Sequence, residues 1–260
     1  MAPIHDAARD ADVETLRRLL AEGVSPDATD NEERTPLHLL CEYNNVGYNA
    51  SSPLALRTQQ RYAYDRLDCF KLLRDAGANL EATTKWDSKP IHCTACSGSV
   101  ELLSLLVQSG VNVDAITTND STALHVAVRK REIDCVQVLL AAGADIDARS
   151  TSGGSSFDIA LSPLYGDRRL WPLFLRAGAE IPTDNTHAQF RDPYIVRVRN
   201  AGGWKKYEQA HLTRITSILE TPLLPPELVR KVLEFWLHAG YYDFEPPPQS
   251  GGGSSDGDDD

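Results

Sequence analysis

Four of the seven histidines in this chain occupy equivalent places in a repeating pattern. His5 and His38 are 33 residues apart, and the same distance separates His92 from His125. Each of the four directly follows a leucine or an isoleucine. A fixed period in the range of about 20–50 residues predicts a stacked solenoid, because one such unit cannot bury its own apolar face and must pack on its neighbours.

Each unit also begins and ends in a similar way. Ser/Thr-Pro or a related pair precedes the apolar run, and proline suits the first turn of a helix. In three units a glycine lies 18 residues after the histidine, at Gly23, Gly110 and Gly143. Such a glycine can adopt the left-handed conformation that ends a helix. The pattern therefore predicts helical units that start and stop at defined residues.

The string Thr35-Pro36-Leu37-His38 and the ending Leu-Leu-x-x-Gly-Ala-x-x-x-Ala resemble ankyrin repeats over about residues 2–182. The resemblance implies an all-α repeat solenoid, in which each repeat has two antiparallel helices and a β-turn finger. The threonine and histidine of the string are then spaced to hydrogen-bond with neighbouring turns. About five repeats are expected: 2–30, 31–83, 84–116, 117–149 and 150–182.

The second repeat carries about 21 extra residues near 46–66, between its two helices. Ser52-Pro53 is typical of a helix start, so the second helix is expected to run long, from about 53 to 75. Tyr48, Tyr62 and Tyr64 lie in this stretch. They are expected either to pack on neighbouring repeats or to contact a partner.

The pattern weakens in the fifth repeat and changes after residue 182. Asp158 stands where the histidine would be, as expected of a degenerate terminal repeat. Residues 183–245 predict a helical module that caps the last repeat, with a short helix from Tyr194, a longer one from Trp204 to about 220 and a last one over 226–239. Residues 246–260 predict a disordered acidic tail.

Composition excludes several classes of function. The formal net charge of −11 makes the chain a poor binder of phosphate backbones or anionic lipids. No apolar run reaches the ~18 residues that span a bilayer. The first residues lack the basic and apolar stretches of a signal peptide, and five cysteines are few and odd in number for a stapled secreted domain. We therefore expect a reducing intracellular location, cytoplasmic or nuclear, with neither nucleic acid nor membrane as partner.

The sequence offers no catalytic constellation. Cys93 and Cys96 form a Cys-x-x-Cys on a first helix, but no second pair at metal spacing accompanies them. They are expected to be packed or groove-facing thiols. The four repeat histidines are explained by structural hydrogen bonds, and no phosphate-binding glycine string occurs. We predict that the chain is not an enzyme and has no cofactor and no catalytic or metal site.

Binding to another protein is better supported. The resemblance implies that finger tips and exposed first-helix positions line a concave groove that recognises protein partners. Trp86 is the strongest candidate, because tryptophan dominates interface energetics, although it could instead pack on its neighbouring finger. The predicted partner-binding residues are Glu33, Arg34, Tyr43, Lys85, Trp86, Asp87, Asp120, Arg129 and Lys130.

Acidic residues recur four positions after the helix-ending glycine, at Asp27, Glu81, Asp114 and Asp147. Their side chains are expected to form a ladder along one side of the fingers. The ladder could be a solvated edge, or it could favour basic partners. Because most of the negative charge belongs to the solenoid, the favoured partner is a protein with a basic surface, bound by a monomeric chain.

Two other functions remain open at this stage. Residues 211–215 and 223–229 are faintly similar to the recruiting box of ankyrin proteins that assemble ubiquitin ligases, and 224–228 resembles the opening of an F-box. The chain could then be a substrate adaptor, with its helices at about 204–240 as the recruiting box. A third possibility is an enzyme within the C-terminal helices.

Overall fold

A computed structural model describes residues 3–42, 53–162, 164–181 and 192–219. The chain divides into two compact units, Met1–Asn200 and Ala201–Asp260. In the described residues of the first unit, the only strand-type pairing is a bridge between Arg149 and Ser155. The helices confirm an all-α repeat solenoid. Helix α11 belongs to the first unit although it follows residue 182, where the sequence predicts the repeat domain to end. That domain boundary stays a prediction.

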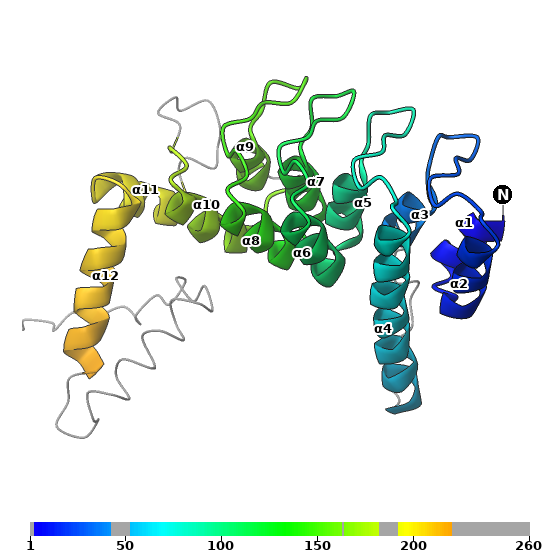
Figure 1. Cartoon of the computed structure of the whole chain (residues 1–260). Coiled ribbons are helices and arrows are strands. Elements are labelled where there is room, and N and C mark those ends of the chain that lie inside the picture. Colours follow the sequence, from blue (N-terminus) through cyan, green and yellow to red (C-terminus); the bar gives the residue numbers. More distant parts are fainter. Residues whose placement is uncertain (1–2, 43–52, 163, 182–191, 220–260) are drawn as a thin grey trace, which may run out of the picture. The chain divides into compact units, whose positions relative to one another are not determined.

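The helices of the repeats form two layers (Figure 1). The first helices pack side by side in one layer: α1 (Pro3–Arg9), α3 (Pro36–Glu42), α5 (Pro90–Ser97), α7 (Ala123–Lys130) and α9 (Ser156–Leu161). The second helices form the other: α2 (Val13–Ala21), α4 (Pro53–Asp75), α6 (Val100–Gln108), α8 (Ile133–Ala141) and α10 (Trp171–Ala177). The apolar core lies between the layers, since Leu40, Phe70 and Leu103 are all fully buried.

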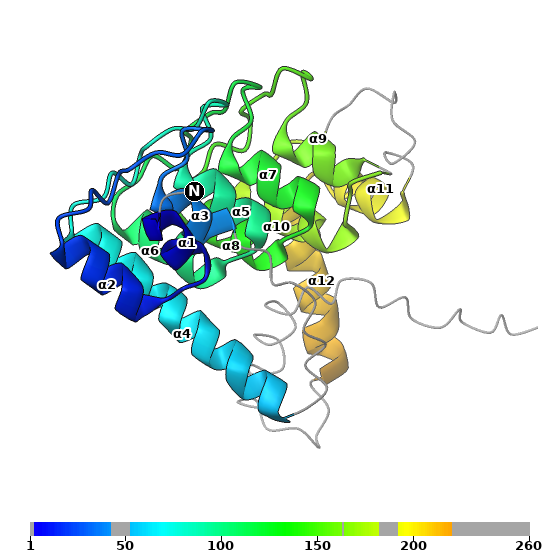
Figure 2. The same cartoon turned by 90° about the vertical axis from the view of Figure 1, so that its right-hand side faces the viewer.

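The fingers are tight hairpins that lead into the first helices and lie along one side of the layers (Figure 2). Finger 1 is Asp30–Arg34, finger 2 Thr84–Ser88, finger 3 Thr117–Ser121 and finger 4 Ser150–Gly154. Backbone hydrogen bonds join neighbours: Lys85 donates to Glu32 at 3.3 Å, Thr118 to Trp86 at 3.1 Å and Thr151 to Asn119 at 3.1 Å. The four fingers are therefore held in register by their main chains.

Each repeat histidine joins the first helix of its own repeat to the finger that leads into the next repeat, as the spacing predicts. At the start of α7, the Thr122 N–H donates to His125 Nδ1 at 3.2 Å, and its hydroxyl lies 2.9 Å from the same nitrogen. His38 Nε2 lies 3.1 Å from the Ser88 carbonyl of finger 2, and His125 Nε2 lies 3.3 Å from Gly154 of finger 4. An imidazole that accepts at Nδ1 and donates from Nε2 is neutral.

The acidic ladder forms as expected, and its role is to join repeats. Asp27 accepts a hydrogen bond from the Asn79 N–H at 2.8 Å, Glu81 from Asn112 at 2.6 Å and Asp114 from Asp145 at 2.8 Å. Each carboxylate thus caps the turn after the second helix of the next repeat. Burial acts to raise the pKa of Glu81, but its bonds from Lys89 and Asn112 outweigh that effect and lower the pKa.

We expect Glu81→Ala to destabilise the solenoid by about 1–2 kcal/mol, because a charged acceptor between two repeats is lost. Asp147→Ala is the matched control, since no donor from a following turn meets that carboxylate in the described part of the chain. Urea unfolding measures both free energies. Equal losses in the two variants would contradict an inter-repeat role for the ladder.

The second repeat contains the long helix that the sequence predicts. Helix α4 has 23 residues where α2, α6 and α8 have 9 each. At 1.5 Å per residue it is about 20 Å longer than they are, and Figures 1 and 2 show it projecting beyond its layer. Tyr62 packs on the first repeat, with its hydroxyl donating to the Arg9 carbonyl at 3.0 Å, while Tyr64 is exposed. Tyr48 and the residues from 43 to 52 lie outside the described residues.

The terminal repeat keeps the same construction with other residues. Asp158 accepts hydrogen bonds from the N–H and hydroxyl of Ser155, at 2.8 and 3.0 Å, and so performs the capping that histidine performs elsewhere. A single turn of 3-10 helix, η1 (Arg168–Leu170), precedes α10. Phe157 and Phe174 stack across α9 and α10 with ring centroids 5.4 Å apart. Helix α11 (Pro193–Asn200) follows and buries Tyr194, as its apolar pattern predicts.

Of the second unit, the structure describes residues 201–219. Helix α12 (Trp204–Leu219) agrees with the predicted longer helix. The predicted helix over 226–239, the box-like residues 223–229 and the acidic tail all lie outside the described residues. In the part of the chain that the structure does describe, each helix is too short or too polar to cross a membrane.

Candidate functional site

The fingers and the exposed residues of the first helices form one continuous surface, here called the inner face. Arg34 of finger 1 donates to Glu42 at the end of α3 at 3.3 Å. Glu42 in turn lies 3.9 Å from the thiol of Cys93 on α5, which is 3.9 Å from the Ser88 hydroxyl of finger 2. Side chains from two fingers and two helices therefore meet on this face.

Trp86 projects from finger 2 with 52% of its surface exposed. Its backbone is held on both sides, because its N–H donates to the Thr84 hydroxyl at 3.3 Å and its carbonyl accepts from Thr118 at 3.1 Å. A large apolar ring on a fixed main chain has little freedom to lose on binding. About half of this residue is therefore left uncovered by the rest of the fold.

The residues beside Trp86 make the finger tips acidic. Glu33, Asp87 and Asp120 occupy equivalent places and have left-handed backbones, with φ of 60°, 54° and 50°. All three side chains are exposed, as is that of Lys85. The hairpin geometry demands positive φ at this position, and finger 4 meets the same demand with Gly153 at 80°. Three predicted contact residues are thus presented to solvent in one row.

Arg34 is placed differently from the other predicted contact residues. Its guanidinium pairs with Asp30 at 2.8 Å, Glu32 at 3.2 Å and Glu42 at 3.3 Å, and only 22% of the side chain is exposed. Burial acts to raise the pKa of Asp30, but hydrogen bonds from Arg34 outweigh it and lower the pKa. Arg34 therefore organises acidic groups at this end of the inner face before any partner binds.

The C-terminal end of α7 carries the opposite charge. Arg129 and Lys130 are both exposed, and among the described residues neither forms an ion pair. They occupy the places on α7 that Glu42 and Tyr43 occupy on the second repeat. Tyr43 itself lies outside the described residues. The inner face thus presents acidic groups beside α3 and basic groups beside α7.

The two cysteines of the inner face differ in burial. Cys93 is buried, and burial raises the pKa of its thiol well above the usual range, so it stays protonated. Cys96 is half-buried, and all five cysteines are free thiols. No cluster of histidine, cysteine and carboxylate side chains suited to a metal ion occurs within the described ranges.

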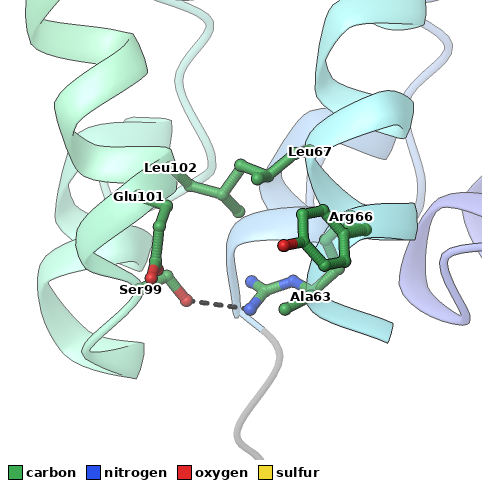
Figure 3. A pocket seen from close by; sticks show the side chains of 7 residues that line it. Ala63, Arg66, Leu67, Ser99, Glu101 and Leu102 are labelled. Carbon is green, nitrogen blue, oxygen red and sulfur yellow. Dashed lines mark hydrogen bonds between the residues drawn. The ribbon is translucent and has the colours of Figure 1, made fainter. Parts of the chain in front are cut away.

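A hollow of about 300 Å³ lies away from the fingers, between α4 and α6 (Figure 3). Arg66 closes one side, donating to the Ser99 hydroxyl at 3.0 Å and to the Leu40 carbonyl at 2.7 Å. Tyr64, which is 69% exposed, stands at its rim. The lining residues are Ala63, Tyr64, Arg66, Leu67, Ser99, Glu101 and Leu102. Sequence reasoning did not find this hollow, because it depends on where the long helix meets the next repeat.

Comparison with known families agrees with this architecture. A model of ankyrin repeats in three copies matches residues 60–150, and a model of ankyrin repeats in many copies matches residues 4–48. The chain therefore belongs to the ankyrin-repeat family. Members of this family generally mediate protein–protein interaction, and they are typically modules without enzymatic activity.

Proposed function

We propose that this chain is a protein-interaction module that binds a partner protein through its inner face. The observation that carries the proposal is Trp86, a half-exposed tryptophan on a finger whose main chain is bonded on both sides. Tryptophan at the centre of a contact surface is a common energetic anchor. The stacked solenoid supplies a preformed surface, which limits the ordering cost of association.

The acidic tips define what kind of protein surface suits this anchor. Glu33, Asp87 and Asp120 surround Trp86 with exposed carboxylates in one row. The ladder carboxylates contribute less to recognition, because three of them already accept hydrogen bonds from the following repeat. A partner with basic residues near its contact point fits the tips, and charge complementarity of this kind mainly adds specificity and association rate.

We expect Trp86→Ala to weaken partner binding roughly tenfold or more, the effect typical of losing an aromatic anchor. Tyr64→Ala is the matched control, since Tyr64 is an exposed aromatic residue on α4, away from the fingers. Both melting temperatures should stay close to that of the wild type, because each side chain is largely exposed. The measurement is quantitative affinity purification of partners with each variant, followed by titration of the recovered partner.

Equal losses of partner affinity in the two variants, or no loss of affinity with Trp86→Ala, would overturn the proposed binding surface. A marked drop in the melting temperature of Trp86→Ala would show instead that the tip is part of the fold.

A further inference from the structure

The inner face changes sign along the axis of the solenoid. Four equivalent positions, each four residues after a repeat histidine, hold Arg9 on α1 and, on the next three first helices, Glu42 on α3, Cys96 on α5 and Arg129 on α7. The three helices pack side by side in the same order. An acidic, a small half-buried and a basic side chain therefore follow one another across neighbouring first helices.

The acidic end is larger than this one row. Arg9, the only arginine or lysine of α1, pairs with Asp6 and Asp10, both at 3.0 Å, so its charge is already balanced by two carboxylates. Arg34 likewise pairs with three carboxylates, those of Asp30, Glu32 and Glu42. Glu33 forms no ion pair among the described residues. The carboxylates at this end are Asp6, Asp10, Asp30, Glu32, Glu33 and Glu42. They outnumber the two arginines and leave an excess of negative charge.

The basic end has no comparable set of counter-ions. Ser121 occupies the sequence position equivalent to Arg34, and Ile159 the position equivalent to Cys93, so neither of these positions supplies a carboxylate. Lys130 acts to lower the pKa of Glu132, but burial outweighs it and raises that pKa, and no ion pair joins the two side chains within the described ranges. Asp120 lies at the apex of finger 3, and no ion pair joins it to Arg129 within the described ranges. Arg129 and Lys130 are therefore available to an acidic group on a partner.

The distance between the two ends sets the spacing that a ligand must match. Neighbouring packed helices lie about 8–10 Å apart, so two steps from α3 to α7 span about 20 Å. An extended chain advances about 3.3 Å per residue, which makes this span about six residues. Trp86 belongs to finger 2, which leads into α5, and so stands between the two charged ends.

We infer that the partner contributes an extended segment that lies along the inner face, with basic side chains near α3 and acidic side chains about six residues away near α7. An apolar residue between the two charged clusters contacts Trp86. This inference rests on the proposed function and specifies its ligand: a charge-separated peptide segment rather than a uniformly basic surface. Opposite charges at both ends fix the position of the segment along the face and disfavour segments of one sign.

The test uses the full chain and random twelve-residue peptides displayed on phage. Peptides enriched on the wild-type chain should carry a basic and an acidic cluster separated by about six residues, with an apolar residue between them. The double variant Arg129→Glu/Lys130→Glu should instead enrich peptides whose acidic cluster has become basic. Arg17→Glu/Arg18→Glu, the same change on exposed residues of the outer helix α2, should select the wild-type pattern.

A synthetic copy of an enriched peptide then gives the affinities by fluorescence anisotropy. The Arg129→Glu/Lys130→Glu variant should bind it roughly tenfold or more weakly, because two attractive contacts become repulsive. Exchanging the acidic residues of the peptide for lysine should restore binding to that variant. Binding of the unchanged peptide to the wild-type chain should also weaken as salt rises from 50 to 500 mM, about the range over which exposed charges become screened.

The outcomes separate the inference from the function on which it rests. Peptides that require Trp86 but show no separated charges, or that bind the Arg129→Glu/Lys130→Glu variant unchanged, would overturn the inference and leave the proposed function standing. Peptides that bind Trp86→Ala as well as wild type would overturn the proposed function. If the wild-type chain enriched no peptide above its level in the unselected library, that result would count against both.

Discussion

Phe70→Ala should lower the free energy of unfolding of the solenoid by about 3–5 kcal/mol, the usual cost of truncating a buried phenylalanine. Phe70 is fully buried on α4, and α4 contacts α2, α3 and α6. A solenoid is stabilised mainly by interfaces between nearest neighbours. A cavity at this position therefore weakens the contacts of the second repeat on both of its sides, and unfolding of the whole array should shift to lower urea concentration.

Phe174→Ala provides the comparison, because this side chain is equally buried but lies on α10 in the terminal repeat. It stacks on Phe157 of α9, so its loss should open the α9 and α10 end while the internal repeats keep their stability. Hydrogen exchange followed by mass spectrometry can locate the two effects. Equal loss of protection along the whole array in both variants would show that the solenoid unfolds as a single cooperative block.

These two phenylalanines also show what the sequence could predict. The long helix that carries Phe70 followed from Ser52-Pro53 and from the spacing of the next glycine, and α4 has the expected bounds. The terminal repeat followed from Asp158 at the histidine position, where the carboxylate accepts hydrogen bonds from Ser155. Both features are local, since a helix start or a cap is decided by a few adjacent residues.

The features that sequence reasoning missed depend on contacts between distant residues. Arg66 links the Leu40 carbonyl at the end of α3 to the Ser99 hydroxyl at the start of α6. Nothing near Arg66 in the chain indicates either partner, because the inserted residues separate α4 from α3. In the same way, the position of Arg34 at a finger tip suggested a free contact residue. Its three carboxylate neighbours include Glu42 on the following helix, and they become visible only in the folded repeat.

The residues predicted to bind a partner are exposed to different degrees in the structure. Trp86, Lys85 and the three acidic tip residues are exposed because a hairpin apex has few neighbours, which the repeat period alone predicts. Their roles in binding stay predictions. The change of sign along the inner face could not be read from net charge, because a sum over the chain carries no positions. Three of the ladder carboxylates that contribute to that sum are bonded to backbone N–H groups of the next repeat.

Acidification should destabilise the solenoid at a pH well above the range in which carboxylates titrate. Burial lowers the pKa of His38, His92 and His125, although their backbone hydrogen bonds act in the opposite direction. In the unfolded chain these imidazoles titrate near their ordinary pKa of about 6.5. Below that pH the unfolded state binds more protons than the folded state, so the free energy of unfolding falls as the pH falls toward the folded pKa values. The neutral form is required because Nδ1 must accept the N–H of residues such as Thr35 and Thr122.

His125→Asn isolates one of these groups, since the amide oxygen of asparagine can replace Nδ1 as acceptor for Thr122 but does not titrate. The variant should be less stable than wild type by about 1–3 kcal/mol at pH 7.5, because the bond to the Gly154 carbonyl and part of the buried ring are lost. Its melting temperature should nevertheless fall less than that of the wild type between pH 7.5 and 5. Carboxylates with lowered pKa values, such as Asp30 and Glu81, lose their contribution at lower pH, so they do not confuse this comparison. If the melting temperatures of the two proteins fell equally between pH 7.5 and 5, His125 would not be a source of the acid sensitivity.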